Sequence, residues 1–127
     1  MFERGEYISF ANCGLPYYIG QVITEREALL VQTVEGMSAR FNLDIRNFSE
    51  VTAVDPDKME VTVKNLQTGQ EYTESYDELI LSPGANPVKP PIPGLADADN
   101  VFTLRNIPDT DAIKAYVDEK EPKEAVV

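Results

Sequence analysis

The sequence contains no histidine and a single cysteine, Cys13. One cysteine excludes an internal disulfide framework. With histidine missing as well, a Cys/His zinc site and a Cys–His nucleophilic pair within this chain are also excluded. Any chemistry at Cys13 must therefore use one thiol, whose partner is a small-molecule thiol, an oxidant, a bound cofactor or another chain.

Positive charge is also scarce, because 11 basic residues face 22 acidic residues and leave a net charge of −11. Such a surface repels phosphate backbones, which argues against nucleic-acid binding. No apolar run approaches the roughly 20 residues that cross a bilayer. The first residues carry acidic side chains and lack the apolar segment of a signal peptide. We therefore predict a cytoplasmic protein that binds neither nucleic acid nor membrane.

A chain of 127 residues is long enough for one α/β domain with a modest core. Residues 2 to 4 resemble the end of a strand, and residues 34 to 41 predict a short helix before a brief strand at 44 to 46. Between residues 49 and 75, apolar side chains such as Val61 and Val63 alternate with polar ones, which is typical of half-buried strands. Turn-forming residues at 55–57 and 67–69 divide this stretch into a three-stranded antiparallel β-meander.

The second half of the chain predicts three further elements and a connection. The apolar run at residues 78 to 81 favours a strand buried on both faces, and the proline-rich stretch 86–94 favours a stiff surface connection. Asp109 is expected to cap an amphipathic helix. Residues 124 to 127 resemble the first half of a buried strand. Both ends look truncated, so we expect a piece of a larger protein.

The cysteine lies in ISFANCGLPYY, residues 8 to 18, directly before a predicted short helix at 14 to 19. Pro16 favours this assignment, because proline in a first helical turn gives up an amide that has no partner there. Free amides and the positive end of the helix dipole would then favour a thiolate. The alternative is that Cys13 is a small buried apolar residue without chemistry.

Three segments carry a resemblance to a known family: FERGEYISFANCGLPYYIG, LILSPGANPVKPPIPG and VFTLRNIPDTDAI. Together they resemble the single-cysteine flavoprotein disulfide reductases, which are pyridine nucleotide-disulfide oxidoreductases, and among these the coenzyme A disulfide reductases. The resemblance implies a homodimeric enzyme with FAD and NAD(P)H as cofactors. In that family hydride passes from NAD(P)H to FAD and on to the cysteine, which forms a mixed disulfide with coenzyme A.

The resemblance also implies roles for individual residues. Cys13 would be the redox-active nucleophile, with Ser9 and Asn12 beside coenzyme A. Glu3 would lie at the end of the second strand of a dinucleotide fold, where an acidic side chain bonds the ribose hydroxyls. The other residues implied to contact FAD are Val51 at the adenine, Ser82, Pro83 and Gly84 where the chain passes the cofactor, and Arg105 near the flavin.

The sequence departs from the family in lacking the Gly-x-Gly-x-x-Gly motif that holds the pyrophosphate. We therefore predict an α/β fragment of a FAD/NAD(P)-binding domain, containing the β-meander and short helices and inactive by itself. Residues 1–123 would be a partial FAD-binding domain, and residues 124–127 the start of an NAD(P)-binding domain. Two other functions stay open: an NADH oxidase or peroxidase that cycles through a cysteine sulfenic acid, and a non-catalytic interaction module.

Overall fold

The computed structural model describes residues 1–127, which fold into two compact units. Unit 1 comprises Met1–Ser9 and Gln32–Pro83, and unit 2 comprises Phe10–Val31 and Gly84–Val127. β1 (Ser9–Phe10) and β2 (Leu30–Gln32) pair as a two-stranded sheet, and each contains a point where the chain passes from one unit to the other. No helix combines the length and the apolar character that crossing a membrane requires.

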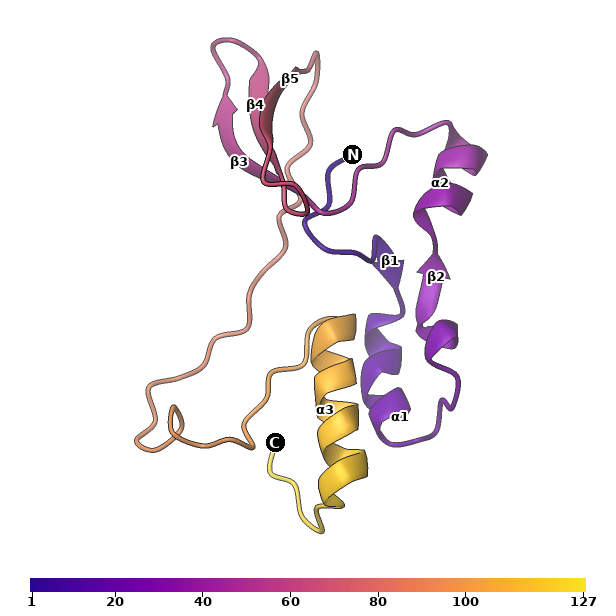
Figure 1. Cartoon of the computed structure of the whole chain (residues 1–127), viewed down its shortest axis with the longest axis vertical. Helices are drawn as coiled ribbons and strands as arrows, with labels where there is room; N and C mark the ends of the chain where they lie inside the picture. The colour runs from indigo at the N-terminus through magenta and orange to yellow at the C-terminus, as the bar shows by residue number, and fades with distance from the viewer. The chain divides into compact units, whose positions relative to one another are not determined.

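Unit 1 contains the antiparallel sheet of β3 (Ser49–Asp55), β4 (Glu60–Asn65) and β5 (Glu71–Ser75). The strands are neighbours in chain order (Figure 1), so the predicted three-stranded β-meander is confirmed. Side chains close both turns: Asp55 Oδ1 accepts from the Lys58 N–H at 3.1 Å, and Asn65 Oδ1 accepts from the Thr68 N–H at 2.9 Å. Local hydrogen bonds of this kind are the reason that Asp and Asn favour turns.

The apolar alternation produces a buried face on β4 but not on β3. Val61 and Val63 are 3% and 0% exposed, whereas Val51 and Val54 on β3 remain 37% and 40% exposed. A register shift between Val51 and Ala53 interrupts the pairing of β3 with β4. Val51 and Val54 still pair with Val63 and Val61, so the four valines lie on one face of the sheet. The valines of β3 are more exposed because β3 is an edge strand, and its expected half-buried face is not formed.

The N-terminal segment of unit 1 forms one strand-type pairing, a parallel bridge between Phe2 and Arg46. The predicted strands at 2–4 and 44–46 are thus reduced to one paired position each. The helix predicted at 34–41 is confirmed as α2 (Val34–Phe41). Thr33 caps it, with Oγ1 accepting from the Gly36 N–H at 3.1 Å.

Unit 2 contains the 3₁₀ turns η1 (Asn12–Gly14) and η2 (Arg26–Leu29) and the helices α1 (Leu15–Ile19) and α3 (Ile107–Lys120). α1 lies alongside α3 (Figure 1), and the two helices are in contact. The core of the unit consists of fully buried side chains: Leu15, Leu29, Ile107 and Thr110. Arg26 in η2 also forms a bidentate ion pair with Asp111 of α3, at 2.9 and 2.7 Å.

The predicted cap of α3 was wrong, because Asn106 caps the helix and Asp109 does not. Asn106 Oδ1 accepts from the Asp109 N–H at 2.9 Å. Asp109 stands in the first turn, where its Oδ2 accepts from the Arg105 N–H at 2.9 Å. The arrangement resembles a capping box, but Asp109 bonds the residue before the N-cap instead of the N-cap itself. Pro108 occupies an early position that needs no donor.

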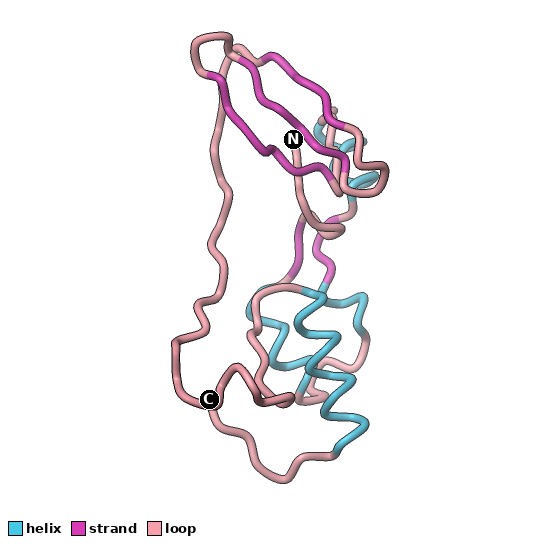
Figure 2. Tube along the Cα trace, turned by 60° about the vertical axis from the view of Figure 1, so that its left-hand side comes forward, coloured by secondary structure: helices cyan, strands magenta, loops and turns pink.

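Between β5 and α3 the chain has no helix or strand (Figure 2). The strand predicted at residues 78–81 is therefore wrong, and Leu79, Ile80 and Leu81 are 37%, 89% and 67% exposed. A strand needs a neighbour for its backbone donors and acceptors, and no strand of the chain pairs with this run. Residues 124–127 likewise form no strand and are exposed. The proline-rich stretch 86–94 is a connection, as predicted.

Candidate functional site

Cys13 is an exposed free thiol in the 3₁₀ turn η1. The predicted helix after Cys13 is present as α1, but it begins at Leu15, one residue later than predicted. Gly14 is its N-cap, and Cys13 stands one residue before this cap. Pro16 occupies the first turn of α1. With only five residues, α1 aligns few peptide dipoles, so exposure of the thiol is the feature that permits reaction. The buried alternative for Cys13 is wrong.

The turn that carries Cys13 is fixed by its neighbours. The Gly14 N–H donates to the Ala11 carbonyl at 2.8 Å, and the Ala11 N–H donates to the Leu29 carbonyl at 2.7 Å. Gly14 is buried, and a Cβ added to it would meet Leu29 Cδ2 at 3.1 Å. Glycine at this position therefore allows the turn to lie directly on the core of unit 2, while the next side chain toward the N-terminus points to solvent.

The two residues expected beside coenzyme A differ in their exposure. Asn12 is exposed and begins the same turn as Cys13, so the two side chains are available together. Ser9 is half-buried in β1 and belongs to unit 1. The structure thus brings Asn12 and Cys13 together and describes Ser9 in the other unit.

Glu3 is held at three atoms within unit 1. Its Oε1 accepts from the Gly5 N–H at 2.6 Å, its N–H donates to the Arg46 carbonyl at 3.0 Å, and its carbonyl accepts from the Ser49 N–H at 2.9 Å. Ser49 begins β3, and Val51 follows two residues later on this edge strand. The structure therefore brings the segment of Glu3 and the start of β3 together.

Gly84 and Arg105 are in direct contact within unit 2. Gly84 has a positive φ of 70°, and a Cβ built on it would lie 2.6 Å from Arg105 Nη2. Arg105 Nη1 donates to Asn86 Oδ1 at 3.1 Å. The segment expected to pass the cofactor and the arginine expected near the flavin are thus neighbours. Ser82 and Pro83, which precede Gly84, are exposed and belong to unit 1.

The bonding partners of these residues were not predicted from the sequence. Asn86 accepts from the Arg105 guanidinium, Asp109 accepts from the Arg105 backbone N–H, and Arg46 contacts the segment of Glu3. The Asn106-to-Asp109 spacing is a capping signal that could have identified Asp109. Nothing in the sequence around Asn86 indicates its contact with an arginine 19 residues away.

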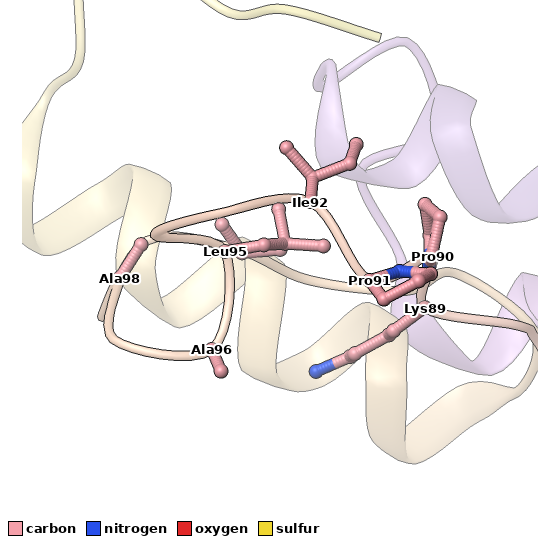
Figure 3. A pocket seen from close by; sticks show the side chains of 8 residues that line it. Lys89, Pro90, Pro91, Ile92, Leu95, Ala96 and Ala98 are labelled. Carbon is pink, nitrogen blue, oxygen red and sulfur yellow. The ribbon is translucent and has the colours of Figure 1, made fainter.

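A pocket of about 260 Å³ lies in the proline-rich connection of unit 2. Figure 3 shows the side chains that line it, which are mostly apolar: Lys89, Pro90, Pro91, Ile92, Leu95, Ala96, Ala98 and Val101. None of them is a predicted site residue. The expected thiol and cofactor residues therefore belong to open surfaces and turns rather than to this pocket.

Comparison with known proteins agrees with the resemblance. The chain is 41% identical over 127 residues to the coenzyme A disulfide reductase of Staphylococcus haemolyticus, an alignment that covers all of this chain and 28% of that protein. The structure matches the reduced CoADR-RHD of Bacillus anthracis with a TM-score of 0.93 and 66% identity, covering 97% of this chain and 22% of the other. It also matches the water-forming NADH oxidase of Lactobacillus brevis with a TM-score of 0.80 and 31% identity, covering 94% and 26%.

The chain thus spans little more than a quarter of the length of the curated relative from S. haemolyticus. A family model described as pyridine nucleotide-disulphide oxidoreductase matches residues 1–127, the whole of this chain. The small α/β fold with its three-stranded antiparallel sheet matches the same solved structures. The chain therefore belongs to the pyridine nucleotide-disulphide oxidoreductase family.

Proposed function

We propose that the protein carrying this chain uses FAD and NAD(P)H to reduce coenzyme A disulfide or a related low-molecular-weight disulfide at Cys13. The observation that carries this proposal is the exposed single thiol in the Asn12–Gly14 turn. No second cysteine of these 127 residues can pair with it, which favours a small-molecule disulfide as its redox partner. The similarity to coenzyme A disulfide reductases indicates what that molecule is.

The thiolate of Cys13 attacks one sulfur of the disulfide, forms a mixed disulfide and releases one substrate thiol. Cleavage of this mixed disulfide requires two electrons, which FAD held at Glu3, Gly84 and Arg105 would supply from NAD(P)H. The second substrate thiol then leaves and Cys13 returns to the thiolate. The sum is one disulfide, one NAD(P)H and one proton converted into two thiols and NAD(P)⁺. Asn12 and Ser9 would bind the coenzyme A portion next to the reacting sulfur.

The described residues fit the parts of FAD assigned to them. One oxygen of Glu3 is used by Gly5, which leaves Oε2 as an acceptor for a ribose hydroxyl. β3 is an edge strand, so backbone groups near Val51 that face away from β4 are open to an adenine. At Gly84 the backbone has no Cβ, and Arg105 supplies positive charge beside it. These features suit a cofactor with hydroxyls, a base and anionic groups.

The proposal includes the domain assignment. Residues 1–123 would be part of a FAD-binding domain, residues 124–127 would start an NAD(P)-binding domain, and the whole protein would be a cytoplasmic homodimer. No Gly-x-Gly-x-x-Gly motif occurs in these 127 residues. The pyrophosphate site would then come from another part of the protein.

The test uses the full-length protein and its Cys13→Ser variant. Without oxygen, the wild type should oxidise NAD(P)H when coenzyme A disulfide is added. The variant should keep its flavin absorbance and lose this activity by several orders of magnitude, because no other cysteine of this chain can replace the nucleophile. Full activity in the variant would refute the role of Cys13.

An NADH oxidase is the second candidate, favoured by the structural match to the L. brevis enzyme. In that case the exposed Cys13 would pass through a sulfenic acid, with oxygen or peroxide as acceptor. Mass spectrometry of the purified full-length protein separates the two functions. A coenzyme A adduct on Cys13 supports disulfide reduction, whereas a sulfenic acid without an adduct supports the oxidase.

A further inference from the structure

The guanidinium of Arg46 links three side chains of unit 1. Its Nε and Nη2 donate to Asp44 Oδ2 at 3.0 and 2.7 Å. Its Nη1 donates to Tyr72 Oη at 3.3 Å and to Glu74 Oε1 at 2.5 Å, and both of these acceptors stand on β5. Arg46 therefore fastens the segment that carries it to the β-meander.

Arg46 also contacts the N-terminal segment, through its side chain and its backbone. The guanidinium lies 5.5 Å from the centre of the Phe2 ring, within reach of a cation–π interaction. The Arg46 N–H donates to the Met1 carbonyl at 2.9 Å, and its carbonyl accepts from the Glu3 N–H at 3.0 Å. One residue thus binds both the ring before Glu3 and the backbone of Glu3.

Backbone hydrogen bonds also hold the N-terminal segment: the Ser49 N–H donates to the Glu3 carbonyl at 2.9 Å, and the Phe48 N–H donates to the Gly5 carbonyl at 3.2 Å. The Arg46 side chain adds the contact that reaches from Phe2 to β5. Phe2–Arg46 is an isolated bridge, whereas β3, β4 and β5 are paired over five or more positions. The other ion pair of the segment, Arg4 to Glu50, is 3.8 Å long and its arginine is 59% exposed. An exposed pair of that length contributes little.

The hydrogen bonds that the guanidinium donates to Asp44, and then to Glu74, raise the pKa of Arg46 above its ordinary value, so the guanidinium stays charged at every working pH. The Arg46 side chain is 35% exposed, and that of Glu74 is 38% exposed. Partial burial weakens the competition from water for these bonds. The anchor to β5 is therefore stronger than a fully exposed ion pair.

We infer that Arg46 is a positioning residue for Glu3, fastening the Phe2–Arg4 segment to β5 so that the Glu3 carboxylate is held ready for a ribose of the cofactor. This inference rests on the proposed function. Arg46 does not touch the cofactor in this account and acts only through Glu3. Loss of the Arg46 side chain leaves the backbone bonds of Glu3 but removes the tie from Phe2 to β5. The segment that carries Glu3 then moves more, which raises the entropy that binding must remove.

A double-mutant cycle in the full-length protein tests the inference. The dissociation constant of FAD is measured by flavin fluorescence on the apoprotein of the wild type, Glu3→Gln, Arg46→Met and the double variant. We expect Arg46→Met to weaken FAD binding about three- to tenfold in the wild type, in the range of one charged hydrogen-bond network. In the Glu3→Gln protein, Arg46→Met should raise the FAD dissociation constant less than about twofold, because the effects of coupled residues are not additive.

The matched control is Lys58→Met, which removes an ion pair of 2.8 Å with Asp55 in the turn between β3 and β4. It should leave FAD affinity unchanged. Glu74→Gln keeps Arg46 and removes only its charged acceptor on β5, so it serves if Arg46→Met does not fold. It should weaken FAD binding in the wild type and not in the Glu3→Gln variant.

Equal weakening by Arg46→Met, or by Glu74→Gln in its place, with and without Glu3 would show that the arginine acts only on general stability. No weakening at all would also overturn the inference. A wild type that binds no FAD rejects the proposed function together with the inference. Additive effects in a protein that does bind FAD reject the inference alone.

Discussion

Gly84→Ala is the substitution whose effect the structure defines best. Gly84 has a φ of 70°, and alanine in that region costs about 1–2 kcal/mol. The new Cβ would also lie 2.6 Å from Arg105 Nη2, where ordinary contacts are 3.4 Å or more. Nη2 is the end of a flexible side chain, so we expect the guanidinium to shift by about 1 Å while unit 2 stays folded. This shift would stretch the 3.1 Å bond to Asn86.

The chain offers matched controls for the backbone cost. Gly69 and Gly94 have φ values of 75° and 85°, and a Cβ added to either meets nothing within 4 Å. Gly69→Ala and Gly94→Ala should therefore lower the free energy of unfolding of the full-length protein in urea by the same amount, about 1–2 kcal/mol. Neither should change the FAD dissociation constant or the flavin absorbance spectrum.

Gly84→Ala should match the controls in stability and differ from them at the cofactor. We expect FAD to bind about tenfold more weakly, which corresponds to one displaced charged contact, with a shifted flavin spectrum. Arg105→Met should produce the same loss, and the double variant should lose little more. If Gly84→Ala and Gly94→Ala are indistinguishable in FAD affinity and spectrum, Arg105 has no role at the flavin.

Three other outcomes are expected. Hydrogen bonds from Arg46 lower the pKa of Asp44 below its ordinary 3.8. The contribution of Asp44 to stability is therefore present above pH 3.8 and is lost as the pH falls through the depressed pKa. Acid unfolding of Asp44→Asn should lack this loss, and acid unfolding profiles identical to the wild type would contradict the prediction. Gly14→Ala should destabilise unit 2 and slow alkylation of Cys13, because the new Cβ would lie 3.1 Å from Leu29 Cδ2. An unchanged thermal unfolding temperature and an unchanged rate of reaction with iodoacetamide would show that the turn tolerates a side chain. The purified 127-residue chain should be colourless and should not oxidise NAD(P)H, since it has no Gly-x-Gly-x-x-Gly motif; stoichiometric flavin absorbance would contradict this.

The sequence predicted elements whose signals are local. α2 and the β-meander follow from short-range periodicity and from turn residues such as Asp55 and Asn65. The position of Cys13 before a helix follows from Gly14 and Pro16 in the same way. In each case the residues that determine the backbone are close neighbours in the chain.

Features that depend on distant partners were missed or wrong. The apolar run at 78–81 has the composition of a buried strand, but burial requires a neighbouring strand that composition cannot reveal. Arg46 bonds side chains 26 and 28 residues away, and no local pattern indicates Tyr72 or Glu74 as its acceptors. The Asn106 cap could have been predicted, because an asparagine three residues before an aspartate is a capping pattern.

The exposed thiol of η1 has a consequence for labelling and storing the 127-residue chain. With one accessible sulfur, each chain can form one intermolecular disulfide. Air oxidation of this chain can join two copies covalently, but cannot extend them into a polymer. A maleimide dye or a nitroxide spin label attaches at one known position without removal of other cysteines, and it reports on the turn that begins α1.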